Sequence, residues 1–325
     1  MTTMKAIVQD SYGSAEVLRL REIDRPTAGD GEVVVQVRAA GISRGDVHLM
    51  TGTPYLVRLL GYGVRRPKNP VPGQDVAGTV VALGPNVTRF SVGDDVFGIA
   101  RGSFAEYAVA REDKLAHKPA SLSFEQAAAM PVSGLTALRA IDSVGVRRGQ
   151  TVLVVGASGG VGTYAVQLAA AAGATVTGVA STGQLDLLRN LGVSHVIDYT
   201  KEDFADGSRT FDVILDIGGV TPIGQLRRAL TPTGTLAIIG GENGSTWSPG
   251  LGRQLHATLL NPIVSQRLTM VMNKEHYSGL ERLAALAEDG SVASYLDRPF
   301  PLSDAADAVG HLEAGRAMGK VVITV

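Results

Sequence analysis

Short runs of valine and other apolar residues, each bounded by glycine or proline, dominate the chain from residue 5 to residue 122. Residues 32–38, 76–82 and 95–99 are the clearest of these runs. Runs of this length, rich in β-branched residues and closed by turn-forming residues, are typical of β-strands. We therefore expect a β-rich domain in the first part of the chain.

The pattern changes at Ser123. Ser123 and Gln126 have the spacing of a capping box in front of an alanine-rich stretch, which predicts the first turn of a helix. From residue 151 onward, apolar runs of strand length alternate with helical patterns. The predicted strands are residues 151–155, 175–180, 195–197, 211–217 and 235–239, and the predicted helices are residues 161–172, a helix ending at Leu191, and residues 223–230. This alternation predicts an α/β fold with a parallel sheet and helices on both of its faces.

The end of the chain has a helical pattern at residues 304–314 and a β-branched run at residues 319–325. This last run could extend the sheet of the second domain or return to the first domain. Composition does not decide between these two placements.

Length and charge limit the classes of protein that the chain can represent. A chain of 325 residues exceeds what one hydrophobic core usually supports, so we expect two domains. The formal net charge is −1, and no long basic block gives the electrostatic footprint of a nucleic-acid-binding protein. We interpret the basic residues between Arg58 and Lys68 as part of a solvated loop. Nucleic acid is not an expected partner.

The chain contains no cysteine, which excludes disulfides, thiol nucleophiles and cysteine-ligated metal clusters. No run of about 18 apolar residues occurs, so we expect no membrane-spanning helix and no membrane partner. The first eight residues do not have the pattern of a secretory signal. A cytoplasmic location is the resulting expectation.

The strongest single signal is a glycine-rich turn. Gly156, Gly159 and Gly162 follow a predicted strand directly and precede a predicted helix. Glycines in this context let the backbone approach a pyrophosphate, whose charge is attracted by free N–H groups and the helix dipole. No Gly-Lys-Ser/Thr follows, which disfavours ATP binding by a P-loop. The turn predicts a dinucleotide site, and a tight turn without a ligand is the alternative.

The residues after the second predicted strand bear on the choice of dinucleotide. NAD-binding folds place a carboxylate there for the ribose hydroxyl. Here residues 180–184 read Ala-Ser-Thr-Gly-Gln, and no carboxylate precedes Asp186. The hydroxyls of Ser181 and Thr182 could donate to a 2′-phosphate, which favours NADPH. NADH stays possible because no arginine or lysine is adjacent, and both residues could instead cap the next helix.

Eight motifs occur in order along the whole chain. They are residues 41–46, 72–80, 92–98, 102–107 and 127–137, the glycine turn, and residues 191–199 and 319–322. In these motifs the chain resembles the medium-chain dehydrogenase/reductase superfamily, and specifically its zinc-free quinone oxidoreductase-like branch.

The resemblance implies a two-domain architecture. A GroES-like β-rich catalytic domain is expected to comprise residues 1–122 and 292–325. A Rossmann domain with a doubly wound parallel sheet is expected at residues 123–291. The resemblance also implies that a cleft between the domains holds nicotinamide and substrate, and that a homodimer is possible.

Three positions separate the chain from the zinc-dependent branch of the superfamily. Where that branch has a zinc-ligating cysteine and a His-Glu pair, this chain has Ser43 and Gln74-Asp75. A serine hydroxyl and a glutamine amide are poor zinc ligands. We therefore expect no bound metal, and expect reduction of quinones or activated alkenes rather than alcohol oxidation.

The resemblance assigns cofactor-binding residues motif by motif. These residues are Met130, Ser133 and Thr136 near the nicotinamide; Gly156, Ser158, Gly159, Gly160, Val161 and Gly162 around the pyrophosphate; Ser181, Thr182 and Tyr199 around the 2′-phosphate; and Gly240, Gly241, Gly319 and Lys320 along the nicotinamide side.

The substrate end of the reaction needs a proton donor or a group that stabilises an oxyanion. Ser43 and Asp46 stand where relatives keep polar active-site residues, and His48 is close in sequence. Tyr55 and Tyr62 lie in a segment, residues 51–68, that could cover the site. Four of these five have a structural alternative: capping or bracing a turn for Asp46, a surface or hydrogen-bonded position for His48, and packing for Tyr55 and Tyr62.

The prediction from sequence is an NADPH-dependent oxidoreductase that transfers hydride to a quinone or an activated alkene, a small-molecule substrate. The alternatives are an enoyl reductase in biosynthesis, a zinc-free alcohol dehydrogenase-like enzyme, and a dinucleotide-binding protein without activity.

Overall fold

The computed structural model describes residues 2–240, 251–271 and 275–325. The chain divides into two compact units, unit 1 with residues 1–135 and 275–325, and unit 2 with residues 136–274. Helix α4 (Pro131–Val144) runs through the first division. The sequence-based prediction places the domain boundaries between residues 122 and 123 and between residues 291 and 292. These boundaries remain a prediction.

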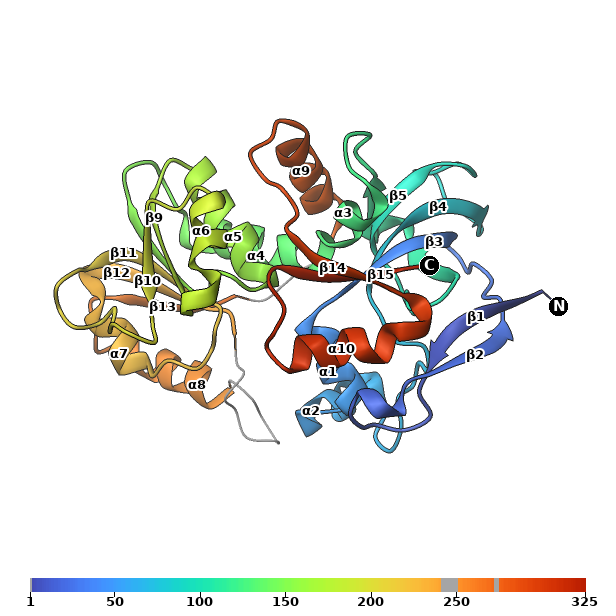
Figure 1. Ribbon diagram of the computed structural model, residues 1–325, viewed down its shortest axis with the longest axis horizontal. Coiled ribbons are helices and arrows are strands. Elements are labelled where there is room, and N and C mark those ends of the chain that lie inside the picture. The colour runs from blue at the N-terminus through green and yellow to red at the C-terminus, as the bar shows by residue number, and fades with distance from the viewer. Residues whose placement is uncertain (1, 241–250, 272–274) are drawn as a thin grey trace. The chain divides into compact units, whose positions relative to one another are not determined.

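Unit 1 is built on a seven-stranded sheet in the order β14-β15-β3-β4-β5-β7, with β6 paired to β3, and on a separate β1-β2 hairpin (Figure 1). Its strands are β1 (Thr3–Val8), β2 (Arg19–Asp24), β3 (Glu32–Ile42), β4 (Asp75–Leu83), β5 (Asp95–Ile99), β6 (Tyr107–Arg111), β7 (Leu115–His117), β14 (Leu296–Pro301) and β15 (Lys320–Thr324). Its helices are α1 (Arg44–Thr51), α2 (Tyr55–Val57), α3 (Phe124–Ala128), α9 (Tyr277–Glu288) and α10 (Ala305–Glu313). The predicted β-rich domain is confirmed.

The β15 strand resolves the two placements that the sequence left open. It pairs antiparallel with β3, where Val321 is opposite Ile42, and parallel with β14. The alternating valine and isoleucine side chains of β15 are buried in the core of unit 1. The end of the chain therefore returns to the first unit.

Unit 2 contains a six-stranded parallel sheet in the order β10-β9-β8-β11-β12-β13. Its strands are β8 (Thr151–Val155), β9 (Thr175–Ala180), β10 (His195–Asp198), β11 (Phe211–Asp216), β12 (Leu230–Ile238) and β13 (Arg267–Met270). Its further helices are α5 (Gly160–Ala171), α6 (Leu185–Asn190), α7 (Ile223–Arg228) and α8 (Leu251–Leu260). Figure 1 shows α5 and α6 on one side of this sheet and α7 and α8 on the other. This strand order is that of the Rossmann fold, so the predicted fold class is confirmed.

Several details differ from the sequence-based expectation, and two of them have a clear physical reason. The predicted helix at residues 223–230 ends at Arg228, because Leu230 already pairs with Phe211 at the start of β12. Strand β14 was not predicted, since its sequence Leu-Asp-Arg-Pro-Phe-Pro contains two prolines. Proline lacks the N–H that a central strand needs, but β14 lies at the edge of its sheet, where proline is tolerated. Within the described residues, every helix is too short or too polar to cross a bilayer.

Candidate active site

The glycine turn joins β8 to α5 at the carboxyl end of the parallel sheet. Gly156 has φ +82°, a left-handed conformation, and a Cβ there would lie 2.8 Å from the backbone nitrogen of Gly218. A Cβ on Gly162 would lie 2.2 Å from the carbonyl oxygen of Gly156. Both positions therefore require glycine: Gly156 because of its left-handed backbone and the nearby backbone of Gly218, and Gly162 because the start of α5 lies against the backbone of the turn.

The third glycine of the turn has a different role. Gly159 is the N-cap of α5 with φ −78°, and a Cβ there would meet only the carbonyl oxygen of Gly156, at 3.6 Å. Helix geometry leaves the N–H groups of Gly160, Val161 and Gly162 without partners within the helix. An open space beside free N–H groups at a helix N-terminus fits the pyrophosphate of a dinucleotide.

Gln184 connects the glycine turn to the segment after β9. The Ser158 hydroxyl donates to Oε1 of Gln184 at 2.5 Å, and the Ser181 hydroxyl lies 3.5 Å from the same oxygen. Ser158 is buried, whereas Gln184 and Ser181 are half-buried. The predicted cofactor residues Ser158 and Ser181 therefore lie together at the carboxyl ends of adjacent strands.

Asp198 is a carboxylate that the sequence analysis missed. It ends β10, and its oxygens accept hydrogen bonds from the Thr182 hydroxyl at 2.5 Å, from the Thr200 hydroxyl at 2.6 Å and from the Thr200 backbone N–H. The hydrogen bonds from Thr182 and then Thr200 lower the pKa of Asp198 to about 2. β9 and β10 are parallel neighbours, so their carboxyl ends lie side by side. The predicted pairing of these two strands could have revealed the contact between Thr182 and Asp198. Tyr199, predicted to be near the 2′-phosphate, is exposed beside it.

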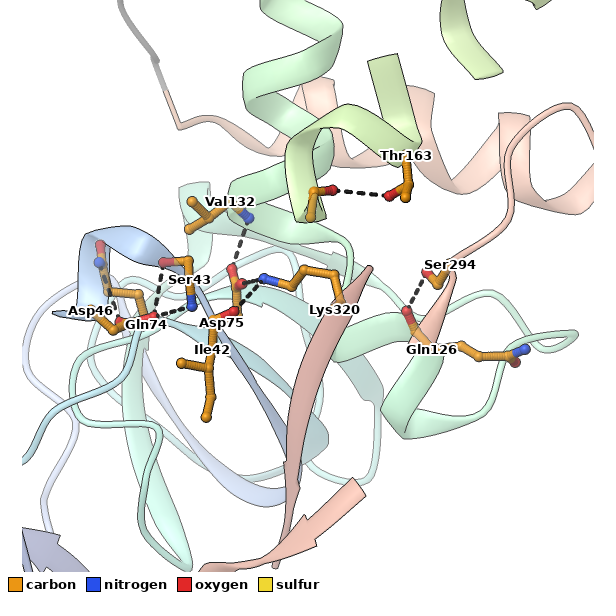
Figure 2. Close-up of polar contacts among 11 residues, drawn as sticks. Ile42, Ser43, Asp46, Gln74, Asp75, Gln126, Val132, Thr163, Ser294 and Lys320 are labelled. Carbon is orange, nitrogen blue, oxygen red and sulfur yellow. Dashed lines mark hydrogen bonds and ion pairs between the residues drawn. The ribbon is translucent and has the colours of Figure 1, made fainter. Parts of the chain in front are cut away.

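In unit 1, Ser43 and Asp46 form a buried pair at the N-terminus of α1 (Figure 2). The backbone N–H and the hydroxyl of Ser43 both donate to Oδ2 of Asp46 at 2.8 Å. The amide of Gln74 lies 3.5 Å from the other carboxylate oxygen. Burial, and next the nearby charge of Asp75, raise the pKa of Asp46 to about 6. The carboxyl group therefore changes protonation near neutral pH.

The Asp46 pKa gives a prediction for stability. Because the folded pKa lies above the ordinary value of 3.8, stability is highest below that value and falls as the pH rises toward about 6. The shift corresponds to about 3 kcal/mol. We expect Asp46→Asn to remove this slope and to raise the free energy of unfolding above pH 6. Urea unfolding across this range measures the effect, and an unchanged slope in the variant would assign the titration to another group.

Asp75 and Lys320 form a second buried pair (Figure 2). The Lys320 ammonium lies 3.0 Å from Oδ2 of Asp75 and donates to the carbonyl oxygen of Ile42 at 3.0 Å. The other carboxylate oxygen accepts the Val132 backbone N–H at 2.7 Å. Burial raises the pKa of Asp75, and the Lys320 charge opposes this shift. Lys320 was predicted as a cofactor residue; its side chain is fully buried against Asp75.

The other predicted site residues are distributed over both units. His48 is half-buried on α1, with Nδ1 3.0 Å from the carbonyl oxygen of Thr53. Tyr55 and Tyr62 are exposed. Met130 and Ser133 are buried, and Thr136 is half-buried on α4. A Cβ at Gly240 would meet the backbone of Ile217, and Gly319 has a left-handed φ of +79°. Gly241 lies outside the described residues. Of the predicted substrate-side residues, Ser43 and Asp46 contact each other directly through a hydrogen bond. The functional roles of all the predicted site residues remain predictions.

Comparison with known proteins identifies the family. Residues 29–120 match the model of the alcohol dehydrogenase GroES-like domain, and residues 191–323 match that of the zinc-binding dehydrogenases. The chain is 34% identical over 340 residues to a 2-methylene-furan-3-one reductase from Solanum lycopersicum, covering 98% of this chain and 79% of the relative. The chain belongs to the medium-chain dehydrogenase/reductase superfamily. The family resemblance in the sequence is confirmed.

Solved structures that are similar to the chain over its whole length include quinone oxidoreductases. The quinone oxidoreductase from Coxiella burnetii superimposes with a TM-score of 0.88 at 31% identity, and both chains are covered completely. A mycobacterial protein solved in complex with NADPH superimposes with a TM-score of 0.84 at 29% identity, covering 99% of this chain and 100% of the other. This medium-chain dehydrogenase/reductase is an oxidoreductase.

Ser43, Gln74 and Asp75 occupy the positions of the catalytic zinc ligands in the zinc-dependent branch. Their side chains do not form a ligand set that fits zinc. The Ser43 hydroxyl donates to Asp46, and Oδ2 of Asp75 faces the Lys320 ammonium. Gln74 supplies only an amide. In residues 2–240, 251–271 and 275–325, no three histidine, aspartate or glutamate side chains gather in a metal-binding arrangement. A cation already held at the carboxylate disfavours a second one there.

Proposed function

We propose that this protein is a zinc-independent reductase that transfers hydride from NADPH to a quinone or to an alkene conjugated with a carbonyl group. The observation that carries the proposal is the turn at Gly156–Gly162, which leaves an open, amide-lined space at the carboxyl end of β8. The Solanum relative is by name a reductase of a methylene-furanone, and the Coxiella structure is by name a quinone oxidoreductase. Both names fit acceptors of this chemistry.

NADPH, when bound, supplies the hydride. The protein supplies three other things. The amides of Gly160, Val161 and Gly162 would hold the pyrophosphate, and the Ser181 hydroxyl, which lies 3.5 Å from Oε1 of Gln184, would donate to a 2′-phosphate. Hydride addition to the substrate leaves negative charge on the former carbonyl oxygen, and a proton neutralises it. The Ser43–Asp46 pair is our candidate source of this proton.

The protonation state of Asp46 decides what Ser43 can donate. When Asp46 is ionised, the Ser43 hydroxyl donates to the carboxylate. When Asp46 is protonated, its own proton can satisfy the Ser43 oxygen, and the Ser43 proton becomes available to a substrate oxygen. The Asp46 pKa of about 6 makes both states accessible near neutral pH. His48, Tyr55 and Tyr62 stay alternative proton donors.

The proposal is tested by the loss of NADPH absorbance with a panel of quinones, enones and 2-enoyl thioesters in a chelating buffer. We expect turnover of quinones or enones that chelation leaves unchanged. Turnover that collapses on chelation would overturn zinc independence. Turnover confined to enoyl thioesters would establish the enoyl reductase instead, and tight NADPH binding without any turnover would establish a binding protein.

Cofactor choice gives a separate prediction at Gly183. A Cβ at Gly183 would have no heavy atom within 4 Å, so the backbone there leaves room for a side chain to begin. The guanidinium of an arginine there would pair with a 2′-phosphate beside Ser181 and Thr182. We expect Gly183→Arg to tighten NADPH binding about tenfold, the size of one charge-assisted contact, and to leave NADH binding unchanged. Fluorescence titration measures both constants, with Gly183→Ala as control; equal gains for both nucleotides would place the 2′-phosphate elsewhere.

A further inference from the structure

The segment of residues 54–68, between α1 and β4, carries a concentration of exposed apolar side chains. It contains α2, which Figure 1 shows beside α1 at the margin of unit 1, and an irregular helical turn, η2 (Arg58–Tyr62). Within ten residues, Tyr55, Leu59, Leu60, Tyr62 and Val64 are exposed. Leu59 and Leu60 keep 68% and 69% of their surface exposed. Single exposed apolar residues are ordinary, whereas large apolar patches often bind a partner, so five such residues within ten positions suggest this role for the segment.

The same segment is strongly basic. Arg65, Arg66 and Lys68 are exposed and form no ion pair within the described part of the chain. No acidic residue occurs between Asp46 and Asp75, although the whole chain has a net charge of −1. The positive charge of the segment is therefore local and is not neutralised by its own chain neighbours.

Contacts at the base of the segment hold its apolar side chains outward. The Tyr12 hydroxyl lies 3.0 and 2.6 Å from the carbonyl oxygens of Tyr62 and Gly63. The Arg58 guanidinium stacks on the Tyr12 ring at 4.4 Å and donates to the carbonyl oxygen of Gly52 at 2.8 Å. These contacts fix both sides of the η2 turn. Leu59 and Leu60 are thus held exposed on a turn that has fixed contacts at its base, so binding a partner costs little conformational entropy.

We propose that the 54–68 segment docks on the surface of a bilayer that contains anionic lipids. Leu59 and Leu60 would enter the boundary between headgroups and acyl chains, and Arg65, Arg66 and Lys68 would pair with lipid phosphates. A second copy of this chain fits the surface less well, because symmetric contact would bring the same unpaired cations together. The proposal goes beyond the proposed function. It also departs from the sequence-based expectation of no membrane partner, which rested on the absence of a spanning helix.

The test is co-sedimentation of the full chain with two vesicle types, phosphatidylcholine alone and phosphatidylcholine mixed with phosphatidylglycerol. We expect binding to the mixed vesicles, and loss of binding in molar salt or without the anionic lipid. Each basic residue near the surface contributes roughly a fivefold gain, so Arg65→Glu/Arg66→Glu should weaken binding at least about tenfold. Leu59→Ser/Leu60→Ser should weaken it by a similar factor because the inserted apolar area is lost.

Matched controls exist in unit 2. Arg147 and Arg148 form another exposed arginine pair, and Ile263 is 80% exposed. We expect Arg147→Glu/Arg148→Glu and Ile263→Ser to bind mixed vesicles like the unmodified chain. An equal loss in these controls would mean that binding follows overall charge or hydrophobicity, and the assigned surface would be wrong.

A second measurement does not depend on the stability of the double variants. Because the chain has no cysteine, Leu60→Cys creates a single site for a polarity-sensitive fluorophore. We expect its emission to shift to the blue with mixed vesicles, and a label at Ile263→Cys to remain unchanged. The absence of binding and of any shift would overturn the proposal. A dimer in light scattering that Leu59→Ser/Leu60→Ser dissociates would overturn it too, since the segment would then join two copies.

Discussion

Gly159→Asp is expected to eliminate measurable NADPH binding without lowering the melting temperature. The backbone at Gly159 has φ −78°, which any residue adopts, and the new Cβ makes only an ordinary contact at 3.6 Å. Aspartate is also a favourable N-cap, so α5 should gain stability. The same carboxylate fills the space beside the free amides and repels a pyrophosphate. We expect the dissociation constant to rise about a hundredfold or more, which corresponds to about 3 kcal/mol.

Gly159→Asn is the matched control, because asparagine has nearly the same size and capping ability but no charge. Fluorescence titration with NADPH and thermal unfolding by circular dichroism measure both variants. We expect the asparagine variant to bind more tightly than the aspartate variant and less tightly than the unmodified protein. Unchanged NADPH affinity in Gly159→Asp would show that the pyrophosphate binds elsewhere, and the proposed function would lose its main support.

Lys320→Met is expected to destabilise the protein by about 3–5 kcal/mol, since it leaves the Asp75 carboxylate buried without its partner. Both side chains are almost completely buried and lie 3.0 Å apart. Burial already raises the pKa of Asp75, and removal of Lys320 takes away the charge that opposes the shift. A carboxyl group with a raised pKa is less destabilising when protonated, so the loss in Lys320→Met should shrink as the pH falls.

The double variant Asp75→Asn/Lys320→Met separates the charge effect from packing. Asparagine keeps an oxygen that can accept the Val132 N–H, and neither charge of the Asp75–Lys320 pair remains. We expect the double variant to recover most of the lost stability in urea unfolding at neutral pH, with no recovery on acidification. Equal destabilisation of the single and double variants would mean that Lys320 stabilises unit 1 through packing and its bond to Ile42 rather than through Asp75.

The parts of the fold predicted from sequence are those with strong local signals. The glycine turn, the strand before it and the helix after it depend on neighbouring residues, and the structure has all three. β14 and β13 were missed, because proline in the first and the shortness of the second obscure the strand pattern. Both strands lie at sheet edges, where sequence constraints are weakest.

The contacts missed from sequence are those between residues that are distant in the chain. Asp198 meets Thr182 only because β9 and β10 are adjacent, and Lys320 meets Asp75 across 245 positions. Ser43 and Asp46 were found because both belong to one turn of α1. The NADPH preference drawn from residues 180–184 did not include Asp198, a carboxylate held on the Thr182 hydroxyl. A charged residue can lie near a site because of how the strands pair, and the residues next to the site in the sequence do not reveal it.

The position of β15 between β14 and β3 constrains how the protein forms during synthesis. The sheet of unit 1 joins a strand near the start of the chain to one made of its final residues. On the ribosome, unit 2 is complete once residue 274 has emerged, whereas the core around β3 must wait for residues 296–324. Unit 2 can therefore fold first, and the nascent amino-terminal strands of unit 1 remain open to chaperones until residues 320–324 have emerged.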